Sequence, residues 1–255
     1  MTPIVSVVMP AFNSEKYIQQ AIDSVRRQTL NEWELIIVDD CSTDLTYDIA
    51  CKIAQEETRI KIIQNVTNCG AAASRNIGFL QCSGKYIALL DSDDLWEPEK
   101  LKKQVECAEI SGADIVYCSY AIVDEQGKRK SPDFIVPDNT DFHSMLKSSV
   151  ISCSTALLSK EVTRNHQFPA GMYHEDLAYW LLLLKNGATA AGIPEVLAAY
   201  RITPGSRASN KIKSAVDRWK IFRKFFHLPL WESISLLIQY AYLGLLKYRK
   251  SVGKG

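Results

Sequence analysis

Short apolar runs rich in β-branched residues alternate with helical patterns through the first half of this 255-residue chain. Apolar runs of this kind, nearly unbroken by polar residues, suit strands that are buried on both faces of a sheet. Strand-helix-strand repetition predicts an α/β fold with a mainly parallel, doubly wound sheet and right-handed crossovers. The expected strands are Ile4–Met9, Glu34–Val38, Ile60–Ile63, Tyr86–Leu90 and Asp114–Cys118, and the expected helices lie around residues 17–25, 45–57, 71–80 and 98–108.

The alternation weakens after residue 120, and the chain ends in a different pattern. The expected elements there are strands at Ser154–Leu158 and Val196–Tyr200, a helix at Tyr173–Asn186, and two helices from about Lys211 that Pro229 separates. We therefore divide the chain into a domain of residues 1–205 and a C-terminal helical extension of residues 206–255.

Charge divides the chain at nearly the same place. Residues 1–204 contain 19 Lys and Arg against 27 Asp and Glu, whereas residues 205–255 contain 11 against 2. The formal net charge of +1 thus averages an acidic body and a basic end, and a basic end indicates an anionic partner. The seven scattered Cys residues favour reduced thiols, and we expect a cytoplasmic protein without a cleavable signal.

Polar clusters follow three of the expected strands, where an open parallel sheet binds its ligands. They are Pro10-Ala11-Phe12-Asn13, Asp39-Asp40-Cys41-Ser42-Thr43-Asp44 and Asp91-Ser92-Asp93-Asp94. A single Asp more often caps a helix or closes a turn. Three clusters at equivalent strand ends argue against coincidence, and Asp91 with Asp93 suits a divalent cation that also binds phosphate oxygens. The chain has no phosphate-binding GxxxxGK loop, no GxGxxG after the first strand and no EF-hand spacing.

The ordered set of motifs in residues 3–205 resembles glycosyltransferase family 2. The motifs are VSVVMPAFN, Glu15-Lys16-Tyr17-Ile18, Ser24-Val25-x-x-Gln28, VDDCSTD, Asn68-x-Gly70, Ser74-Arg75-Asn76-x-Gly78, LLDSDD and the later Glu175-Asp176. The resemblance implies a GT-A fold, which has a Rossmann-like, mainly parallel sheet flanked by helices. It also implies inverting transfer of a sugar from a nucleotide-activated donor.

The resemblance assigns residues to a nucleotide-sugar site. They are Pro10, Phe12, Asn13, Asp39, Asp40, Arg75, Asp91, Ser92, Asp93 and Arg201. In this assignment Asp39 contacts the base, and Asp93, with Asp91 beside it, is the ligand of Mn²⁺ or Mg²⁺. Two alternatives stay open: Arg75 could form a structural ion pair with an Asp at the sheet end, and Asp40 and Asp94 could cap the helices that follow them.

The Glu175-Asp176 pair is the candidate for catalysis. Inversion needs a base opposite the departing diphosphate, and a well-placed carboxylate is sufficient. The resemblance gives this role to Asp176, with Glu175 orienting it or binding the acceptor, although both acids would also favour a helix start. Many members of the family that the chain resembles carry a His after the last core strand, and this chain has none there. Arg201 or Arg207 is therefore expected to neutralise diphosphate charge. A solvated basic loop is the alternative there.

The basic extension is expected to contact an anionic membrane surface. Lys and Arg alternate with aromatic residues over 211–226, and the uncharged stretch Ser233–Leu246 is too short to span a bilayer. This pattern suits helices that lie in the membrane interface. The alternative is packing on the body or on a second subunit of a homo-oligomer. No nucleic-acid module accompanies the basic residues, so we expect no nucleic-acid partner.

These observations predict an inverting glycosyltransferase that uses a nucleotide sugar, first of all a UDP-sugar, with Mn²⁺ or Mg²⁺. The expected acceptor is a polyprenyl-diphosphate-linked or polysaccharide sugar of the bacterial envelope, at the inner face of the cell membrane. The alternatives are a sugar-1-phosphate nucleotidyltransferase, whose Gly- and Arg-rich loop is absent after the first strand, and a catalytically silent sugar-nucleotide-binding module.

Overall fold

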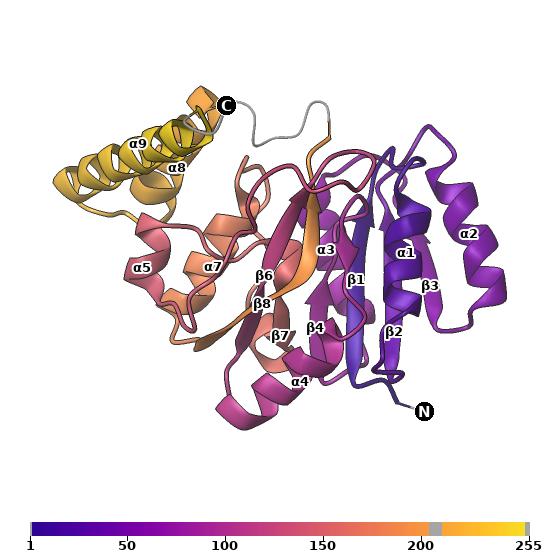
Figure 1. The fold of residues 1–255 in the computed structure, drawn as a ribbon. Helices are drawn as coiled ribbons and strands as arrows, with labels where there is room; N and C mark the ends of the chain where they lie inside the picture. The colour runs from indigo at the N-terminus through magenta and orange to yellow at the C-terminus, as the bar shows by residue number, and fades with distance from the viewer. Residues whose placement is uncertain (1, 204–210, 253–255) are drawn as a thin grey trace.

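The computed structural model describes residues 2–203 and 211–252 and shows an eight-stranded sheet with helices on both faces (Figure 1). The strands are β1 (Val5–Ala11), β2 (Trp33–Asp39), β3 (Ile60–Gln64), β4 (Tyr86–Leu89), β5 (Leu95–Trp96), β6 (Ile115–Val123), β7 (Leu157–Ser159) and β8 (Ala190–Arg201). Their order is β3-β2-β1-β4-β7-β6-β8-β5, and among these strands β7 and β5 run against the other six. The predicted α/β fold with a mainly parallel sheet is confirmed.

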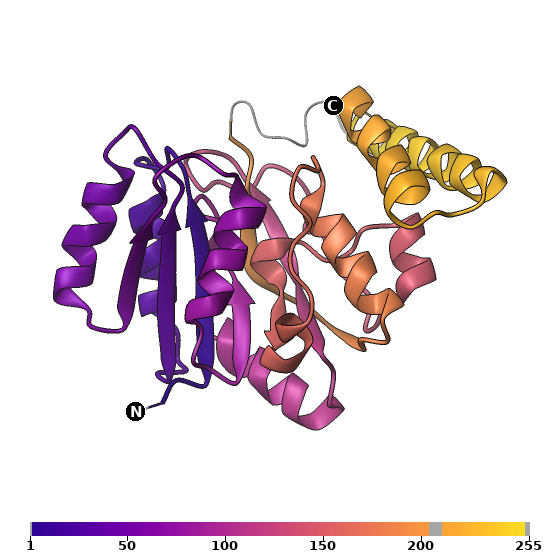
Figure 2. The same ribbon diagram turned by 180° about the vertical axis from the view of Figure 1, so that it is seen from behind.

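The helices divide between the two faces of the sheet, so the core has two parts. The helices are α1 (Ile18–Arg26), α2 (Thr46–Glu56), α3 (Ala71–Gln81), α4 (Lys100–Ser111), α5 (Phe142–Lys147), α6 (Lys160–Arg164), α7 (Glu175–Lys185), α8 (Lys211–Lys220) and α9 (Leu230–Val252), with the short turns η1 (Cys153–Thr155) and η3 (Ile221–Phe225). Leu35 and Ile37 of β2 pack with α1, α2 and α4, whereas Ile36 and Val38 pack with α3 and α7 on the face seen in Figure 2. The alternation follows from the two-residue period of a strand.

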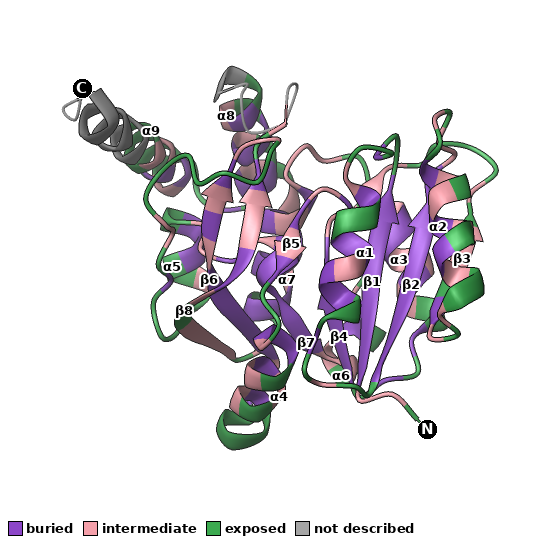
Figure 3. Ribbon diagram, turned by 45° about the vertical axis from the view of Figure 1, so that its right-hand side comes forward, coloured by how far each residue is buried: buried purple, intermediate pink, exposed green. Residues whose placement is uncertain are grey.

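Figure 3 shows that β1 and β2 are buried along their length, while the outer turns of α1, α2 and α4 are exposed. Burial on both faces is what the unbroken apolar runs indicated. On the α3 side the helix lies very close to the sheet, because a Cβ on Gly78 would come within 2.5 Å of Val8 Cγ1. Gly78 therefore fixes how closely α3 approaches β1.

The structure differs from the sequence prediction where the alternation weakens. The strand expected at Ser154–Leu158 is instead η1 followed by the three-residue β7, which is antiparallel to β4 and β6. The two-residue β5 and the six-residue α5 were not predicted. Elements this short contain too few residues to show a period.

The C-terminal extension packs on the body beside α5 and α7 (Figure 1). The core cluster that contains α7 also includes Phe222 of η3, Phe226 just after η3, and Leu236 of α9. Lys185 Nζ of α7 lies 5.2 Å from the Phe226 ring centroid. Packing on the body, one of the two alternatives, thus accounts for the inner faces of these helices. The outer face of α9 stays exposed, with Trp231 at 73% exposure. Residues 206–210 and 253–255 of the extension, and with them the Arg207 considered for the diphosphate, lie outside the described residues.

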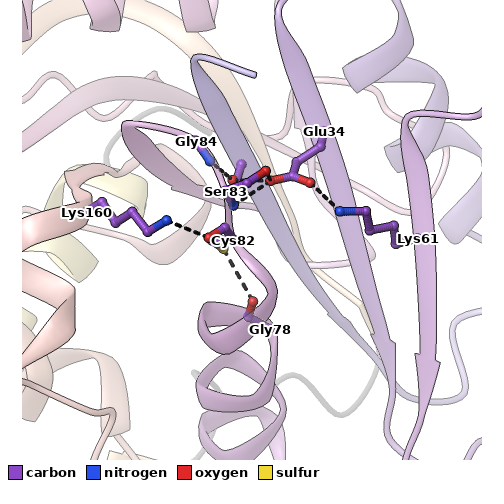
Figure 4. Close-up of polar contacts among 8 residues, drawn as sticks. Glu34, Lys61, Gly78, Cys82, Ser83, Gly84 and Lys160 are labelled. Carbon is purple, nitrogen blue, oxygen red and sulfur yellow. Dashed lines mark hydrogen bonds and ion pairs between the residues drawn. The ribbon is translucent and has the colours of Figure 1, made fainter. Parts of the chain in front are cut away.

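A buried carboxylate joins the amino ends of the central strands (Figure 4). Glu34 Oε1 accepts hydrogen bonds from Ser6 Oγ (2.7 Å) and from the N–H and Oγ of Ser83 (2.7 and 2.6 Å), and Oε2 accepts from Lys61 Nζ (2.8 Å). Burial alone would raise the pKa of Glu34, but the hydrogen bonds from Lys61, Ser83 and Ser6 outweigh burial and lower the pKa from 4.5 to about 2. The network ties β1, β2 and β3 to the loop that follows α3.

Replacing this carboxylate with an amide should destabilise the fold in a pH-dependent way. Glu34→Gln should lower the free energy of unfolding at neutral pH by roughly 3 kcal/mol, because a depressed pKa measures how strongly the folded state favours the ionised group. The pKa is lower in the folded state, so this stabilisation is complete above pH 4.5 and is lost as the pH falls toward about 2. Urea unfolding of wild type and variant at neutral and acid pH measures the difference. Glu32→Gln, on an exposed side chain, is the control, and a difference that does not shrink in acid would contradict the prediction.

Candidate functional site

A cleft of about 1210 Å³ opens at the carboxyl ends of the parallel strands. Its walls come from the loops after β1, β2 and β4, from α3 and α7, from β6 and β8, and from α8 of the extension. The predicted site residues that line it are Pro10, Phe12, Asn13, Asp40, Arg75, Asp91, Ser92, Asp93, Glu175 and Asp176. Asp39 and Arg201, also predicted, are buried and do not line the cleft.

The loops after β1, β2 and β4 are tied together by polar contacts. Asn13 has a positive φ of 49°, a conformation that Asn tolerates better than most residues, and its N–H donates to Ser42 Oγ (3.0 Å). Ser14 Oγ lies 2.7 Å from Ser92 Oγ, which connects the first loop to the third. These contacts hold Phe12, which is 47% exposed, at the rim of the cleft.

Asp39, at the end of β2, is buried, and one of its two carboxylate oxygens accepts no hydrogen bond from the described residues. Its Oδ2 accepts from the Ser42 N–H (3.1 Å) and from Gln64 Nε2 (3.3 Å). Its Oδ1 is buried and has no hydrogen-bond partner among the described residues. A buried acceptor without a donor costs free energy, so this oxygen is suited to a ligand donor.

Asp40 holds the turn that begins α3. Its Oδ1 accepts from the Cys69 N–H (2.9 Å) and its Oδ2 from the Gly70 N–H (2.7 Å). Burial opposes ionisation of Asp40, but these hydrogen bonds outweigh it and lower the pKa. Asp40 therefore does not cap α2, the helix that follows it, but holds the turn before α3, and its side chain also borders the cleft.

Arg75 of α3 connects the two ends of the cleft. Its Nη2 lies 2.5 Å from Asp91 Oδ1, after β4, and its Nη1 lies 3.6 Å from Glu175 Oε1, at the start of α7. The side chain is only 5% exposed, and its Nε and Nη1 have no hydrogen-bond partner in the described chain. The structural ion pair considered for Arg75 is thus present, and the same side chain lines the cleft.

Three carboxylates crowd the loop after β4. Burial raises the pKa of Asp93 to about 6, the charge of Asp91 adds to this rise, and Arg201 opposes it. Burial and the charges of Asp93 and Asp91 raise the pKa of Asp94 well above its usual range. Asp94 faces inward, where it accepts from Ser154 Oγ (2.6 Å) and from the Arg201 N–H (2.8 Å). Asp91 and Asp93 are the two members of the cluster that border the cleft.

Arg201 has a different position from the one expected for a diphosphate ligand. It is 1% exposed, and all three guanidinium nitrogens donate within the protein: Nε to the Asp93 carbonyl (2.7 Å), Nη1 to the Glu125 carbonyl (2.6 Å) and Nη2 to Gln20 Oε1 (2.9 Å). Each guanidinium nitrogen already has an acceptor within the protein, so Arg201 holds the acidic loop in place without lining the cleft. Arg201 thus positions the acidic loop and does not reach the cleft, which corrects the expectation that it contacts the diphosphate. Because the side chain is buried, the alternative of a solvated basic loop does not apply to Arg201 either.

The first turn of α7 presents the acidic pair. Most of α7 is buried, so its N-terminus is firmly placed. Asp176 lines the cleft, and its Oδ1 accepts from the Leu177 N–H (2.8 Å), while Glu175 is buried beside Arg75. The His174 N–H donates to Asp217 Oδ2 of α8 (2.7 Å), and His174 Nε2 is buried without a partner among the described residues. Burial lowers the pKa of His174, which keeps the ring neutral at neutral pH.

Several residues that line the cleft were not predicted for it. They are Tyr120 of β6, Tyr200 of β8, Tyr173 and His174 before α7, residues 149–153, and Arg218 of α8. Arg218 was noted only as one of many basic residues in the extension. Its burial, at 8% exposure, is the distinguishing feature, and burial is not visible in a basic and aromatic pattern.

Two relatives match almost the whole chain. TuaG of Bacillus subtilis (strain 168), named for teichuronic acid biosynthesis, is 37% identical over 239 residues, which cover 94% of this chain and 95% of TuaG. WfgD of Escherichia coli, named as a UDP-Glc:alpha-D-GlcNAc-diphosphoundecaprenol beta-1,3-glucosyltransferase, is 32% identical over 249 residues, which cover 96% of this chain and 95% of WfgD. The crystal structure of S. aureus TarS 1-349 with UDP-GlcNAc has the same fold, with a TM-score of 0.73 at 22% identity over 91% of this chain and 70% of that chain.

A family model matches roughly the N-terminal two thirds of the chain. The model for Glycosyl transferase family 2 matches residues 6–166, which include the polar clusters after β1, β2 and β4 and the whole of α3. Together with the relatives, this match favours a glycosyltransferase over the nucleotidyltransferase and the silent binding module. The chain belongs to glycosyl transferase family 2 and is a glycosyltransferase.

Proposed function

We propose that this glycosyltransferase transfers a sugar from a UDP-sugar to a hydroxyl group of a lipid-linked or polysaccharide acceptor in bacterial surface-glycan synthesis, with inversion. The observation that carries the proposal is that one cleft contains the Asp91 and Asp93 carboxylates and also Asp176 on a separate element. A donor and an acceptor held between these groups would react as an oriented pair. The names of WfgD and TuaG and the UDP-GlcNAc bound to TarS support these substrate classes.

The loops after β1 and β2 suit a uracil base. Asp39 does not border the cleft, and its Oδ1 is a buried acceptor without a donor among the described residues. The N3–H of uracil, once admitted between these loops, is a donor of the right kind. Phe12 adds an exposed aromatic ring near this end of the cleft, suited to contact with a planar base.

The acidic loop after β4 fits a divalent cation shared with the donor diphosphate. In the part of the chain that the structure describes, no group of three or more His, Cys, Asp or Glu side chains is arranged to hold a metal alone. Asp91 and Asp93 supply two carboxylates, and their crowding, seen in the raised pKa of Asp93, is the situation that a cation relieves. Mn²⁺ or Mg²⁺ at this loop would offset the charge of the departing diphosphate.

Asp176 is the proposed general base. In an inverting reaction it removes the proton of the acceptor hydroxyl while that oxygen attacks the anomeric carbon, and UDP departs from the opposite face. Glu175 is already engaged with Arg75, so Asp176 is the member of the pair left to face the acceptor. Arg75 then orients both Glu175 and Asp91.

The extension is proposed to contact an anionic membrane surface through the outer face of α9. No helix of the described residues is long and apolar enough to cross a membrane. Trp231 and Ile238, seven residues apart and so on one side of the helix, are 73% and 64% exposed. Exposed apolar side chains in a strongly basic segment are suited to the interface of anionic lipid.

Removing the base should abolish transfer and leave donor binding intact. Asp176→Asn should lower kcat about 10²- to 10⁴-fold, the usual contribution of a general base, with the Kd for UDP unchanged. Transfer is measured with radiolabelled donor, and UDP binding by calorimetry. Asp48→Asn is the matched control, because Asp48 is also an acid in the first turn of a helix but is exposed and outside the cleft. Asp176 would lose its assigned role if its variant kept normal turnover.

If Asp93 is a metal ligand, replacing it should weaken UDP binding only when the divalent cation is present. Asp93→Asn should weaken UDP binding in the presence of Mn²⁺ at least about tenfold, because one of the two carboxylate ligands is removed. Binding measured in EDTA should be the same for wild type and variant, which separates loss of metal from loss of fold. Unchanged binding in Mn²⁺ would show that Asp93 is not a ligand.

The membrane proposal predicts that exposed apolar residues on the outer face of α9 contribute more to vesicle binding than exposed apolar residues elsewhere. The double variant Trp231→Ser/Ile238→Ser should reduce sedimentation with phosphatidylglycerol vesicles about tenfold or more, since each apolar side chain contributes a few kcal/mol when buried in lipid. The control is Val66→Ser/Leu80→Ser, at positions that are 94% and 76% exposed on the body. Equal losses in both double variants, or no loss in either, would reject α9 as the contact.

A further inference from the structure

Arg218 is a buried cation with hydrogen-bond donors that no described residue accepts. It belongs to α8, is 8% exposed, and lines the cleft together with His174 and Asp176. Its Nε and Nη1 are buried and have no hydrogen-bond partner among the described residues. Leaving charged donors unpaired inside a protein is costly, so a group that arrives with the substrate is expected to satisfy them.

The position of Arg218 is fixed by its surroundings. Its Cζ lies 4.3 Å from the ring centroid of Tyr240 on α9, and the preceding residue, Asp217, accepts the His174 N–H at 2.7 Å. These two contacts join α9, α8 and the start of α7. Arg218 therefore enters the cleft as part of a packed element.

The acids near Arg218 are engaged elsewhere. Asp217 Oδ2 accepts from the His174 backbone, Glu175 is paired with Arg75, and Asp176 Oδ1 accepts from the Leu177 N–H. Burial lowers the pKa of Arg218, whereas the interaction with Tyr240, which includes a side-chain hydrogen bond, and the charges of Asp176 and Asp217 oppose this change. Arg218 therefore lies near two carboxylates, but its Nε and Nη1 have no hydrogen bond to either of them among the described residues.

The location relative to Asp176 indicates which substrate Arg218 meets. In an inverting reaction the base and the departing diphosphate lie on opposite faces of the anomeric carbon, so a cation beside the base is on the acceptor side. Arg75, by contrast, contacts Asp91 at the donor end. This step rests on the proposed function, in which Asp176 is the base.

A second cavity continues away from this side of the cleft. It has a volume of about 570 Å³ and is lined by Tyr173, Val216 and Asp217 together with Lys213 and Lys220. Lys213 Nζ lies 4.6 Å from the ring centroid of Tyr173, a residue that also borders the main cleft. Cationic side chains thus extend from the acceptor side of the cleft along α8.

We propose that Arg218 binds a phosphate oxygen of the acceptor, so that the enzyme selects acceptor sugars attached to a diphosphate. The guanidinium presents unused N–H groups on Nε and on Nη1, which suit charge-assisted hydrogen bonds to phosphate oxygens. The C-terminal extension is then part of the substrate-binding site.

Acceptor selectivity tests the proposal. Transfer from the UDP-sugar that the wild type uses is measured to two acceptors, an alkyl α-GlcNAc diphosphate and octyl α-GlcNAc, which lacks phosphate. Arg218→Met removes the charge and keeps an extended side chain against Tyr240. It should lower the kcat/KM preference for the diphosphate acceptor at least tenfold, as expected for a lost charge-assisted hydrogen bond. Arg218→Lys should retain part of the preference, and Lys224→Met, which removes an exposed charge of η3, should retain all of it.

Other results would overturn the proposal. Equal losses with both acceptors would make Arg218 a structural residue, and a raised Kd for UDP would assign it to the donor diphosphate. Unchanged selectivity in both Arg218 variants would exclude the contact, and the Lys variant keeps the test valid if the Met variant does not fold. If the wild type used no UDP-sugar with either acceptor, the proposed function itself would fail.

Discussion

The buried ion pairs of Arg75 are the constraint on which the cleft depends. One guanidinium, 5% exposed, lies between Asp91 at the end of β4 and Glu175 at the start of α7. A buried charge is tolerated only with its partners in place, so α3, the acidic loop and α7 cannot move independently without leaving a charge unpaired. Gly78, one turn further along α3, lets the helix lie close against β1 and thereby sets the position of Arg75.

Negative charge is concentrated in the loop after β4, and Arg201 holds this loop in place. Asp93 and Asp94 have raised pKa values because they are buried close to each other and to Asp91. Arg201 bonds the Asp93 carbonyl and thus holds the loop without occupying the cleft. At the opposite, amino end of the central strands, Glu34 fixes β1, β2 and β3 separately, so the framework below the crowded loop does not depend on that loop.

The sheet and its carboxyl-end clusters could be predicted because each depends on local pattern. Burial on both faces leaves unbroken apolar runs, and Asp91 and Asp93 follow such a run directly. Arg201 could not be placed, because its partners Gln20 and Glu125 are far from it in sequence. Arg218 could not be distinguished from the surface cations around it, since only packing against Tyr240 shows that it is buried.

The C-terminal extension connects the proposed site to the proposed membrane contact. Leu236 is buried on the inner side of α9, Trp231 and Ile238 are exposed on the outer side, and α8 carries Arg218 into the cleft. An acceptor anchored in lipid has its diphosphate at the membrane surface. A single packed element that meets both the lipid and that diphosphate would bring the acceptor hydroxyl to Asp176 without a large movement of the body. On this argument the basic charge of the extension has two roles, attraction to the membrane surface and recognition of the acceptor phosphate. Recognition requires a buried cation with unused donors, and among the described cations of α8 only Arg218 meets both conditions.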